Sequence, residues 1–194
     1  FDNCGNISLS ASNTNFTCSD IGINSVTLTV VNGDSSSCIA DVNVIDTIAP
    51  TAICQNIDVY LDNSGNVSIN PSDIDGGSFD NCGNISLSAS NTNFTCSDIG
   101  INSVTLTANN GNGNSSSCIA NVNVIDTINP IIPLIDDINV ECSVSIPIPV
   151  AVDNCSGIVL GNTTDPLIYN TLGSFIINWT FDDGNGNVIQ YAQN

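Results

Sequence analysis

The stretch FDNCGNISLSASNTNFTCSDIGINSVTLT occupies Phe1–Thr29 and occurs again, without a single change, at Phe79–Thr107. The two occurrences lie 78 residues apart. Beyond them the spacing becomes 80, because Ala108–Ala120 has two residues more than Val30–Ala40. Insertions are best tolerated in loops, so Gly111–Asn114 is predicted to be a loop. The chain is therefore a tandem array of similar copies.

A more divergent third copy follows Pro130. Its DNC motif, Asp153–Cys155, and its GNGN motif, Gly184–Asn187, each lie 73 residues after their counterparts in the second copy. A period near 80 residues is too long for a solenoid unit and suits one small, self-contained domain per copy. We therefore predict the C-terminal part of a truncated module at 1–49, a complete module at 50–129, and a divergent module at 130–194 that is truncated at its end.

The composition excludes several classes of partner. The chain contains no Lys, Arg or His and has 19 acidic residues, which gives a formal net charge of -19. A nucleic-acid partner is excluded, because phosphate binding needs cationic side chains. No apolar run approaches the roughly 20 residues of a membrane span, so we expect no membrane insertion in this fragment.

Short alternating runs of β-branched residues, separated by stretches rich in Asn, Ser and Thr, predict strands and turns. Ala52–Leu61 and Val67–Asn70 flank a DNSGN turn and predict a hairpin. Further strands are expected at Cys38–Ile45, Ile85–Ala89, Asn102–Ala108 and Cys118–Ile125. About seven short strands in each copy predict an all-β fold of tandem immunoglobulin-like β-sandwich modules of about 80 residues, held together by disulfide bonds.

Nine cysteines recur at repeat positions, which predicts disulfide bonds made in an oxidising, extracytoplasmic compartment. They are Cys4, Cys18, Cys38, Cys54, Cys82, Cys96, Cys118, Cys142 and Cys155. A metal-thiolate site is the weaker interpretation, because the chain has neither His nor a CxxC motif.

The four cysteines of the complete copy allow three pairings. We favour Cys54 with Cys118, because the first and last strands of an immunoglobulin-like sandwich can run side by side in parallel. Cys82 would then pair with Cys96 across a hairpin. Pairing of Cys54 with Cys82 remains an alternative.

The other copies follow from the same reasoning. The third copy has Cys142 and Cys155 only, so these two are predicted to pair. In the first copy one cysteine, Cys38 or Cys4, would have its partner before residue 1. The odd number of cysteines is then explained without a reactive thiol.

Calcium is the main candidate ligand. Asp73, Asp75 and Asp80 lie in one glycine-bearing loop, where hard oxygen ligands could surround a cation that takes six to eight oxygens. The competing interpretation is a solvated acidic loop, and the spacing is not that of an EF-hand. Asp46 and Asp126, in the linkers DTIAP and DTINP, are a second possibility, since a cation between copies would stiffen the array. A simple turn before proline is favoured there.

We expect no catalytic activity. Without His or Lys, and with paired cysteines, the chain has no nucleophile beside an activating base. Asp136 with Asp137, or Asp182 with Asp183, would make a poor acid-base pair, because neighbouring residues on a strand point to opposite faces. Turn capping explains Asp182 better.

Several motifs carry a resemblance to a known family. They are the opening AIC at Ala52–Cys54, the DNC that follows an acidic loop, the SCxAxVxV strand at Ser117–Val124 and the linking DxxxP. In these the chain resembles hyalin-repeat and related immunoglobulin-like modules. In its cation-poor, Asn-rich form it looks like the repeat arrays of Bacteroidetes cell-surface adhesins, including gliding-motility adhesins exported by the type IX secretion system.

The resemblance implies a long, secreted, non-catalytic stalk, anchored at the outer membrane through parts not in this chain, that supports adhesion to surfaces or polysaccharide. It also makes Thr47 and Thr127 candidate O-glycosylation sites, since DTI matches the D-S/T-aliphatic pattern of secreted Bacteroidetes proteins. An alternative is self-association along the cell surface, into an extracellular filament or sheath. Another is a carbohydrate-binding module, but one Trp and three Tyr supply few aromatic rings, and Trp179 is expected in the core.

Overall fold

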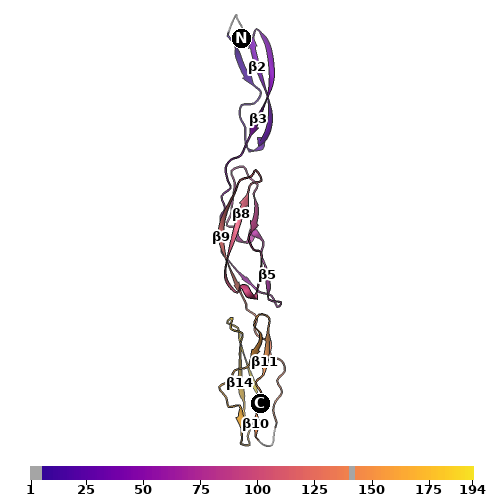
Figure 1. Ribbon diagram of the computed structural model, residues 1–194, viewed down its shortest axis with the longest axis vertical. Helices are drawn as coiled ribbons and strands as arrows, with labels where there is room; N and C mark the ends of the chain where they lie inside the picture. Colours follow the sequence, from indigo (N-terminus) through magenta and orange to yellow (C-terminus); the bar gives the residue numbers. More distant parts are fainter. Residues whose placement is uncertain (1–5, 140–142) are drawn as a thin grey trace. The chain divides into compact units, whose positions relative to one another are not determined.

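The computed structural model describes residues 6–139 and 143–194, and in these ranges every regular element is a strand or a short 3-10 helix (Figure 1). Two of the predicted disulfide cysteines, Cys4 and Cys142, lie outside the described residues. The all-β class predicted from the sequence is confirmed. Contacts divide the chain into two compact units. Unit 1 comprises Phe1–Ile53, Gly77–Ser88 and Thr107–Cys118, and unit 2 comprises Cys54–Gly76, Ala89–Leu106 and Ile119–Asn194.

The first copy forms a three-stranded antiparallel sheet in the order β1-β2-β3. Its strands are β1 (Ser8–Ala11), β2 (Gly22–Asn32) and β3 (Asp34–Val44), and the 3-10 helix η1 (Cys18–Asp20) precedes β2. The turn between β2 and β3 requires a positive φ, which Gly33 provides at 78°.

The second copy contains six strands and two 3-10 helices. They are β4 (Ile57–Tyr60), β5 (Asn66–Ser68), η2 (Pro71–Ile74), β6 (Ser86–Ala89), β7 (Asn93–Thr95), η3 (Cys96–Asp98), β8 (Gly100–Asn109) and β9 (Ser115–Ile125). The strands form a four-stranded sheet, β4-β9-β8-β6, and a two-stranded sheet, β5-β7. The first and last strands, β4 and β9, run parallel, as expected for an immunoglobulin-like sandwich.

The predicted hairpin between Ala52–Leu61 and Val67–Asn70 is wrong, because β5 pairs with β7 rather than with β4. The DNSGN turn does form, and the Asp62 carboxylate accepts the Ser64 and Asn66 N–H groups at 2.8 and 3.0 Å. The turn takes the chain from one sheet to the other. There, Val67 lies opposite the buried Phe94, a pairing that favours burial of apolar surface.

Buried and exposed side chains alternate along the long strands of the second copy, as the sequence predicts. Along β9, Ala120, Val122 and Val124 are buried, whereas Ile119 and Asn121 are exposed. The loop predicted at Gly111–Asn114 lies between β8 and β9 and is confirmed.

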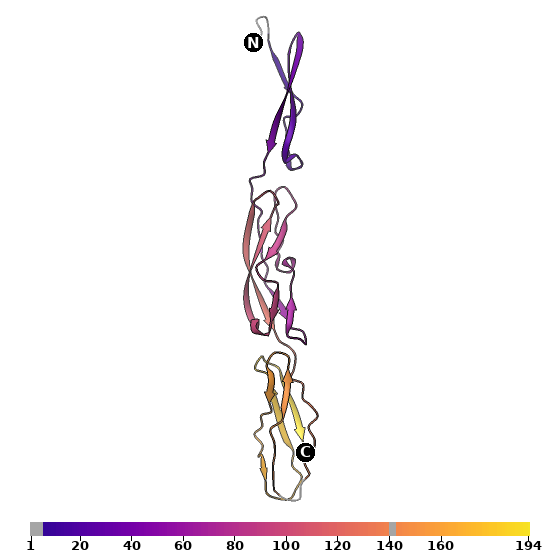
Figure 2. The same ribbon diagram turned by 45° about the vertical axis from the view of Figure 1, so that its right-hand side comes forward.

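The third copy consists of three antiparallel strand pairs, seen from a second side in Figure 2. They are β10 (Val144–Ser145) with β13 (Ile168–Tyr169), β11 (Val150–Asp153) with β12 (Gly157–Leu160), and β14 (Ile177–Asp182) with β15 (Val188–Gln193). Trp179 is buried among Ile146, Ala151 and Phe181, which confirms its predicted core position. Its Nε1–H donates to Gln193 Oε1 at 2.9 Å, so the indole nitrogen is satisfied.

Candidate metal centre

Three acidic side chains of unit 2 converge from three strand ends. Asp126 directly follows β9, Asp153 ends β11 and Asp183 directly follows β14. Each offers a carboxylate oxygen, and these three oxygens all lie within 4.8 Å of one another. The side chains are only 3%, 5% and 8% exposed, respectively. The group is therefore enclosed, unlike an ordinary acidic surface.

Asp126 is held by a turn at the linker between the second and third copies. Its Oδ1 accepts the Ile128 N–H at 3.1 Å, and its backbone carbonyl accepts Asn187 Nδ2–H at 3.2 Å. The turn before Pro130 that the sequence favours is thus present. It coexists with the acidic cluster rather than replacing it.

Asp153 has one occupied and one unpartnered oxygen. Oδ1 accepts the N–H groups of Cys155 and Ser156 at 2.8 and 2.7 Å. Oδ2 is buried and has no hydrogen-bond partner, and the same is true of Asn154 Oδ1. A buried polar atom without a partner costs about 1–3 kcal/mol, so both oxygens suit a ligand that accepts electron pairs.

Asp183 is fixed by the GNGN turn that follows it. Its Oδ1 accepts the N–H groups of Asn185 and Asn187 at 2.8 and 3.1 Å. Its Oδ2 accepts Asn187 Nδ2–H at 2.7 Å. The turn therefore sets the direction of this carboxylate toward the other two.

A bound cation would stabilise the cluster of Asp126, Asp153 and Asp183. Three carboxylates so close together repel one another when ionised, and burial strengthens the repulsion. The chain contains no Lys, Arg or His that could neutralise them. Carboxylate and amide oxygens are the donors that hard divalent cations prefer. The residues present therefore fit a metal ion, which the three carboxylates would hold.

Two disulfide bonds each join one copy to the next, and each involves the cysteine of a DNC motif. Cys96, in η3 of the second copy, is bonded to Cys155 of the DNC motif of the third. In unit 1, Cys18 of the first copy is bonded in the same way to Cys82 of the second. The predicted bonds Cys82–Cys96 and Cys142–Cys155 are therefore wrong.

A sequence signal for these bonds existed. The third copy keeps the DNC cysteine, Cys155, but has Tyr169 where the second copy has Cys96. A DNC cysteine that bonds to the preceding copy needs no partner in its own copy. Cys54 and Cys118 are each disulfide-bonded as well, and their predicted mutual bond remains a prediction. Among the cysteines that the structure describes, Cys38 is free, and it is exposed.

The acidic loop named from the sequence has another arrangement. The Asp73 carboxylate accepts the Asn70 N–H at 2.7 Å and closes the capping box of η2. Asp75 forms an isolated bridge with Cys54 and is half-buried. Asp80 belongs to unit 1, whereas Asp73 and Asp75 belong to unit 2. Among residues 6–139 and 143–194, the metal-holding group that is found contains none of these three.

The candidate glycosylation sites are accessible. Thr47 and Thr127 are both exposed, each in the turn that its preceding aspartate, Asp46 or Asp126, caps. Exposure permits modification, and glycosylation itself remains a prediction.

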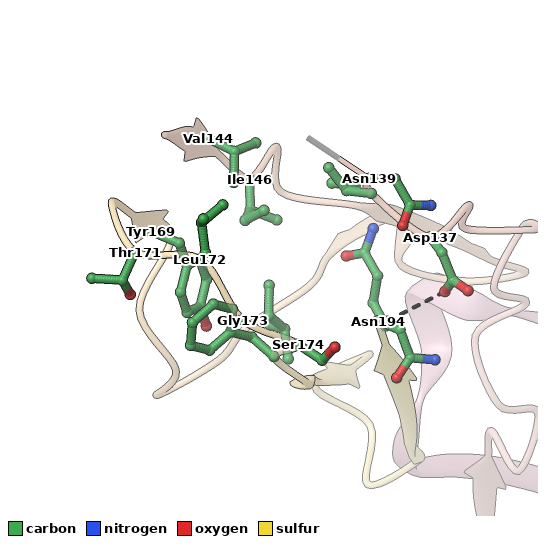
Figure 3. A pocket seen from close by; sticks show the side chains of 14 residues that line it. Asp137, Asn139, Val144, Ile146, Tyr169, Thr171, Leu172, Gly173, Ser174 and Asn194 are labelled. Atoms are coloured by element: carbon green, nitrogen blue, oxygen red, sulfur yellow. Dashed lines mark hydrogen bonds between the residues drawn. The ribbon is translucent and has the colours of Figure 1, made fainter. Parts of the chain in front are cut away.

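A separate pocket of about 210 Å³ lies in the third copy, and Figure 3 shows its lining. Tyr169 and Phe175 both line it, with ring centroids 4.4 Å apart. At its other side the Asn194 N–H donates to Asp137 Oδ1 at 3.3 Å.

Comparison with known proteins gives no family assignment. No family model matches the chain, and no curated protein matches it. Among solved structures, protocadherin gammaB7 EC3-6 is 17% identical, with 96% of this chain and 67% of that chain covered and a TM-score of 0.37. PcdhgB3 EC1-4 is 11% identical, with coverages of 99% and 64% and a TM-score of 0.40.

An endo-fucoidan hydrolase of glycoside hydrolase family 107 is 12% identical, with a TM-score of 0.31; the match covers 96% of this chain and 38% of the hydrolase. Similarities this distant support no functional argument. The fold class rests on the strands and sheets described above. Within the described residues, no helix is long and apolar enough to cross a membrane.

Proposed function

We propose that the chain is part of a non-catalytic repeat stalk of a secreted bacterial cell-surface adhesin, in which consecutive copies are fastened by a disulfide bond and by calcium. The observation that carries the proposal is the pair of disulfides that join one copy to the next. Such bonds persist in oxidising, extracytoplasmic compartments, which supports an extracellular location. A covalent bond between consecutive copies would keep a long stalk intact while it holds a cell to a surface.

Calcium is the cation that best suits the cluster of Asp126, Asp153 and Asp183. The three carboxylates supply at least three oxygens, and water can complete the six to eight that calcium takes. Magnesium demands a smaller octahedral site and keeps more of its own water. The cation would neutralise Asp126 of one copy together with Asp153 and Asp183 of the next.

The stalk would present its adhesive parts to an extracellular surface or polysaccharide. The identity of Phe1–Thr29 with Phe79–Thr107 supports a spacer role, since a binding surface needs only one copy of its contact residues. Gliding motility and type IX export belong to this proposal through the sequence resemblance alone.

Thermal unfolding of the oxidised chain, with calcium and then with chelator, tests the calcium-fastened joint. At 100 times the Kd, a ligand that binds only the folded state stabilises it by about 2.7 kcal/mol, so we expect the melting temperature to rise by several degrees. Asp153→Asn should abolish the rise, and Asp136→Asn, at an exposed acid outside the cluster, should preserve it. An equal response in both variants would refute the site.

A further inference from the structure

The residues where the first and second copies meet correspond in sequence to those of the metal centre, where the second and third copies meet. One of them differs: Asn110 stands where the metal centre has Asp183. We define the first joint as Asp46, Asp80, Asn110 and Asn114, and the second joint as their counterparts Asp126, Asp153, Asp183 and Asn187. The residues of the first joint all belong to unit 1, and those of the second all belong to unit 2. The comparison can therefore be made within each unit separately.

The linker aspartate is held alike in both joints. Asp46 Oδ1 accepts the Ile48 N–H at 3.0 Å, as Asp126 Oδ1 accepts the Ile128 N–H at 3.1 Å. The backbone carbonyl of Asp46 accepts Asn114 Nδ2–H at 2.9 Å. This repeats the contact of Asn187 with the Asp126 carbonyl.

The aspartate of the DNC motif is also held alike. Asp80 Oδ1 accepts the Cys82 N–H at 3.0 Å, and Asp153 Oδ1 accepts the Cys155 N–H at 2.8 Å. In both residues Oδ2 is buried and lacks a hydrogen-bond partner. Each DNC cysteine is disulfide-bonded to the preceding copy.

The third position is where the joints diverge. Asn110 Oδ1 accepts the N–H groups of Asn112 and Asn114 at 3.0 and 3.3 Å, just as Asp183 Oδ1 accepts two N–H groups of its own turn. These bonds fix the orientation of the amide, because a flipped Asn110 would point its NH₂ at two N–H donors. Its Nδ2 then donates to Asp46 Oδ2 at 3.1 Å and to the Ile48 carbonyl at 3.3 Å.

The Asn110 amide partly offsets the charge of the linker carboxylate, as a bound cation would. It brings hydrogen-bond donors to the linker carboxylate and removes one negative charge from the group. In the second joint the amide donors nearest the Asp126 carboxylate, Asn154 Nδ2 and Asn185 Nδ2, are both 3.5 Å away, at the limit of a hydrogen bond. The second joint therefore holds three carboxylates, and its linker carboxylate receives only marginal hydrogen bonds from side-chain amides.

We infer that the residue at position 110 or 183 decides whether a joint takes a divalent cation. Asp183 makes the second joint a calcium site, whereas in the first joint the Asn110 amide donates to the Asp46 carboxylate in place of an ion. This rests on the proposed calcium site and adds the residue that specifies it. One side chain would then make the first joint of this chain cation-independent and the second cation-dependent.

Native mass spectrometry of the oxidised full chain, titrated with Ca²⁺ alone, counts the ions. The unsubstituted chain should bind one specific calcium ion, Asp183→Asn should bind none, and Asn110→Asp should bind two. Asn112→Asp adds the same charge to an exposed position of the same loop and should leave the count at one. Asp182→Asn removes the exposed acid beside Asp183 and should also leave it at one.

Thermal unfolding separates a specificity role from a folding defect. Asp183→Asn should remain folded, and its melting temperature should no longer change on chelation. A count of one for both the unsubstituted chain and a folded Asn110→Asp variant would overturn the inference and leave the calcium proposal intact. A count of zero for the unsubstituted chain would overturn the calcium proposal itself.

Discussion

The segments Phe1–Thr29 and Phe79–Thr107 share one sequence but differ in burial. Leu28 is 37% exposed, whereas its counterpart Leu106 is fully buried. Phe16 is half-buried, whereas Phe94 is enclosed. The difference arises outside the shared sequence, because in the second copy the preceding segment also contributes buried residues. These are Leu61, Ile69 and Ile74.

Many local hydrogen bonds, by contrast, recur in both segments. The Thr27 N–H donates to Ser12 Oγ at 3.0 Å, and the Thr105 N–H donates to Ser90 Oγ at the same distance. The 3-10 turns before β2 and β8 carry the same Thr–Asp capping box. The caps and the long strands thus follow from the local sequence. Burial, and the strand β7 that pairs with β5, depend on the segment that covers the sheet.

Thiol labelling should give the largest contrast between the copies. Cys38 and Cys118 occupy equivalent CIA sequences, but Cys38 is a free, exposed thiol and Cys118 is disulfide-bonded. Maleimide added to the folded, non-reduced chain should label Cys38 almost completely and Cys118 not at all. Peptide mapping distinguishes them, because their flanking residues differ. Labelling of Cys118 without reductant would contradict the comparison.

Phenylalanine truncation should give the next largest contrast. Phe94→Ala removes a buried ring and should cost about 3–5 kcal/mol, whereas Phe16→Ala removes a half-buried ring and should cost clearly less. Amide hydrogen exchange measured by NMR at Thr105 and Thr27 reports each copy separately. Mass spectrometry alone would not resolve peptides of identical sequence. Equal losses would mean that the two sheets are covered alike.

Removal of the Ser12 or Ser90 hydroxyl should have the smallest effect on the free energy of unfolding, and the effect should be the same in both copies. Ser12→Ala and Ser90→Ala each delete one hydrogen bond of equal length, so each should cost about 0.5–1.5 kcal/mol. Urea denaturation of each variant provides the measurement, because Thr27 and Thr105 lose their own hydrogen-bond acceptors in these variants. A loss confined to Ser90→Ala would show that this bond depends on burial and is not a local feature.

The features predicted correctly from the sequence are those encoded over short distances. Alternation along β9 follows from the period of a strand, and the loop at Gly111–Asn114 follows from an insertion between two copies. The core position of Trp179 follows from its alignment with Leu106. The hairpin prediction failed because a turn specifies a reversal of the chain, and not which strand the returning segment pairs with.

The candidate site was predicted only in part. Asp126 was named as a linker residue, and Asp80 is the second-copy counterpart of Asp153. Asp183 was noted only beside a turn cap, because the sequence alone does not show that three loops from two copies meet. Both the acidic cluster and the bonded cysteines combine residues of consecutive copies. Reasoning confined to one copy could not find them.

The bonds from Cys18 to Cys82 and from Cys96 to Cys155 have a mechanical consequence. Under tension, a pulling force passes through each disulfide and bypasses the chain that it encloses. Between Cys18 and Cys155, only the 14 steps from Cys82 to Cys96 remain to be drawn out. At about 3.5 Å per residue, this stretch spans at most roughly 50 Å when fully extended, against several hundred ångströms for the reduced chain between Cys18 and Cys155. With both bonds oxidised, the segment between Cys18 and Cys155 can lose its fold under load and barely lengthen.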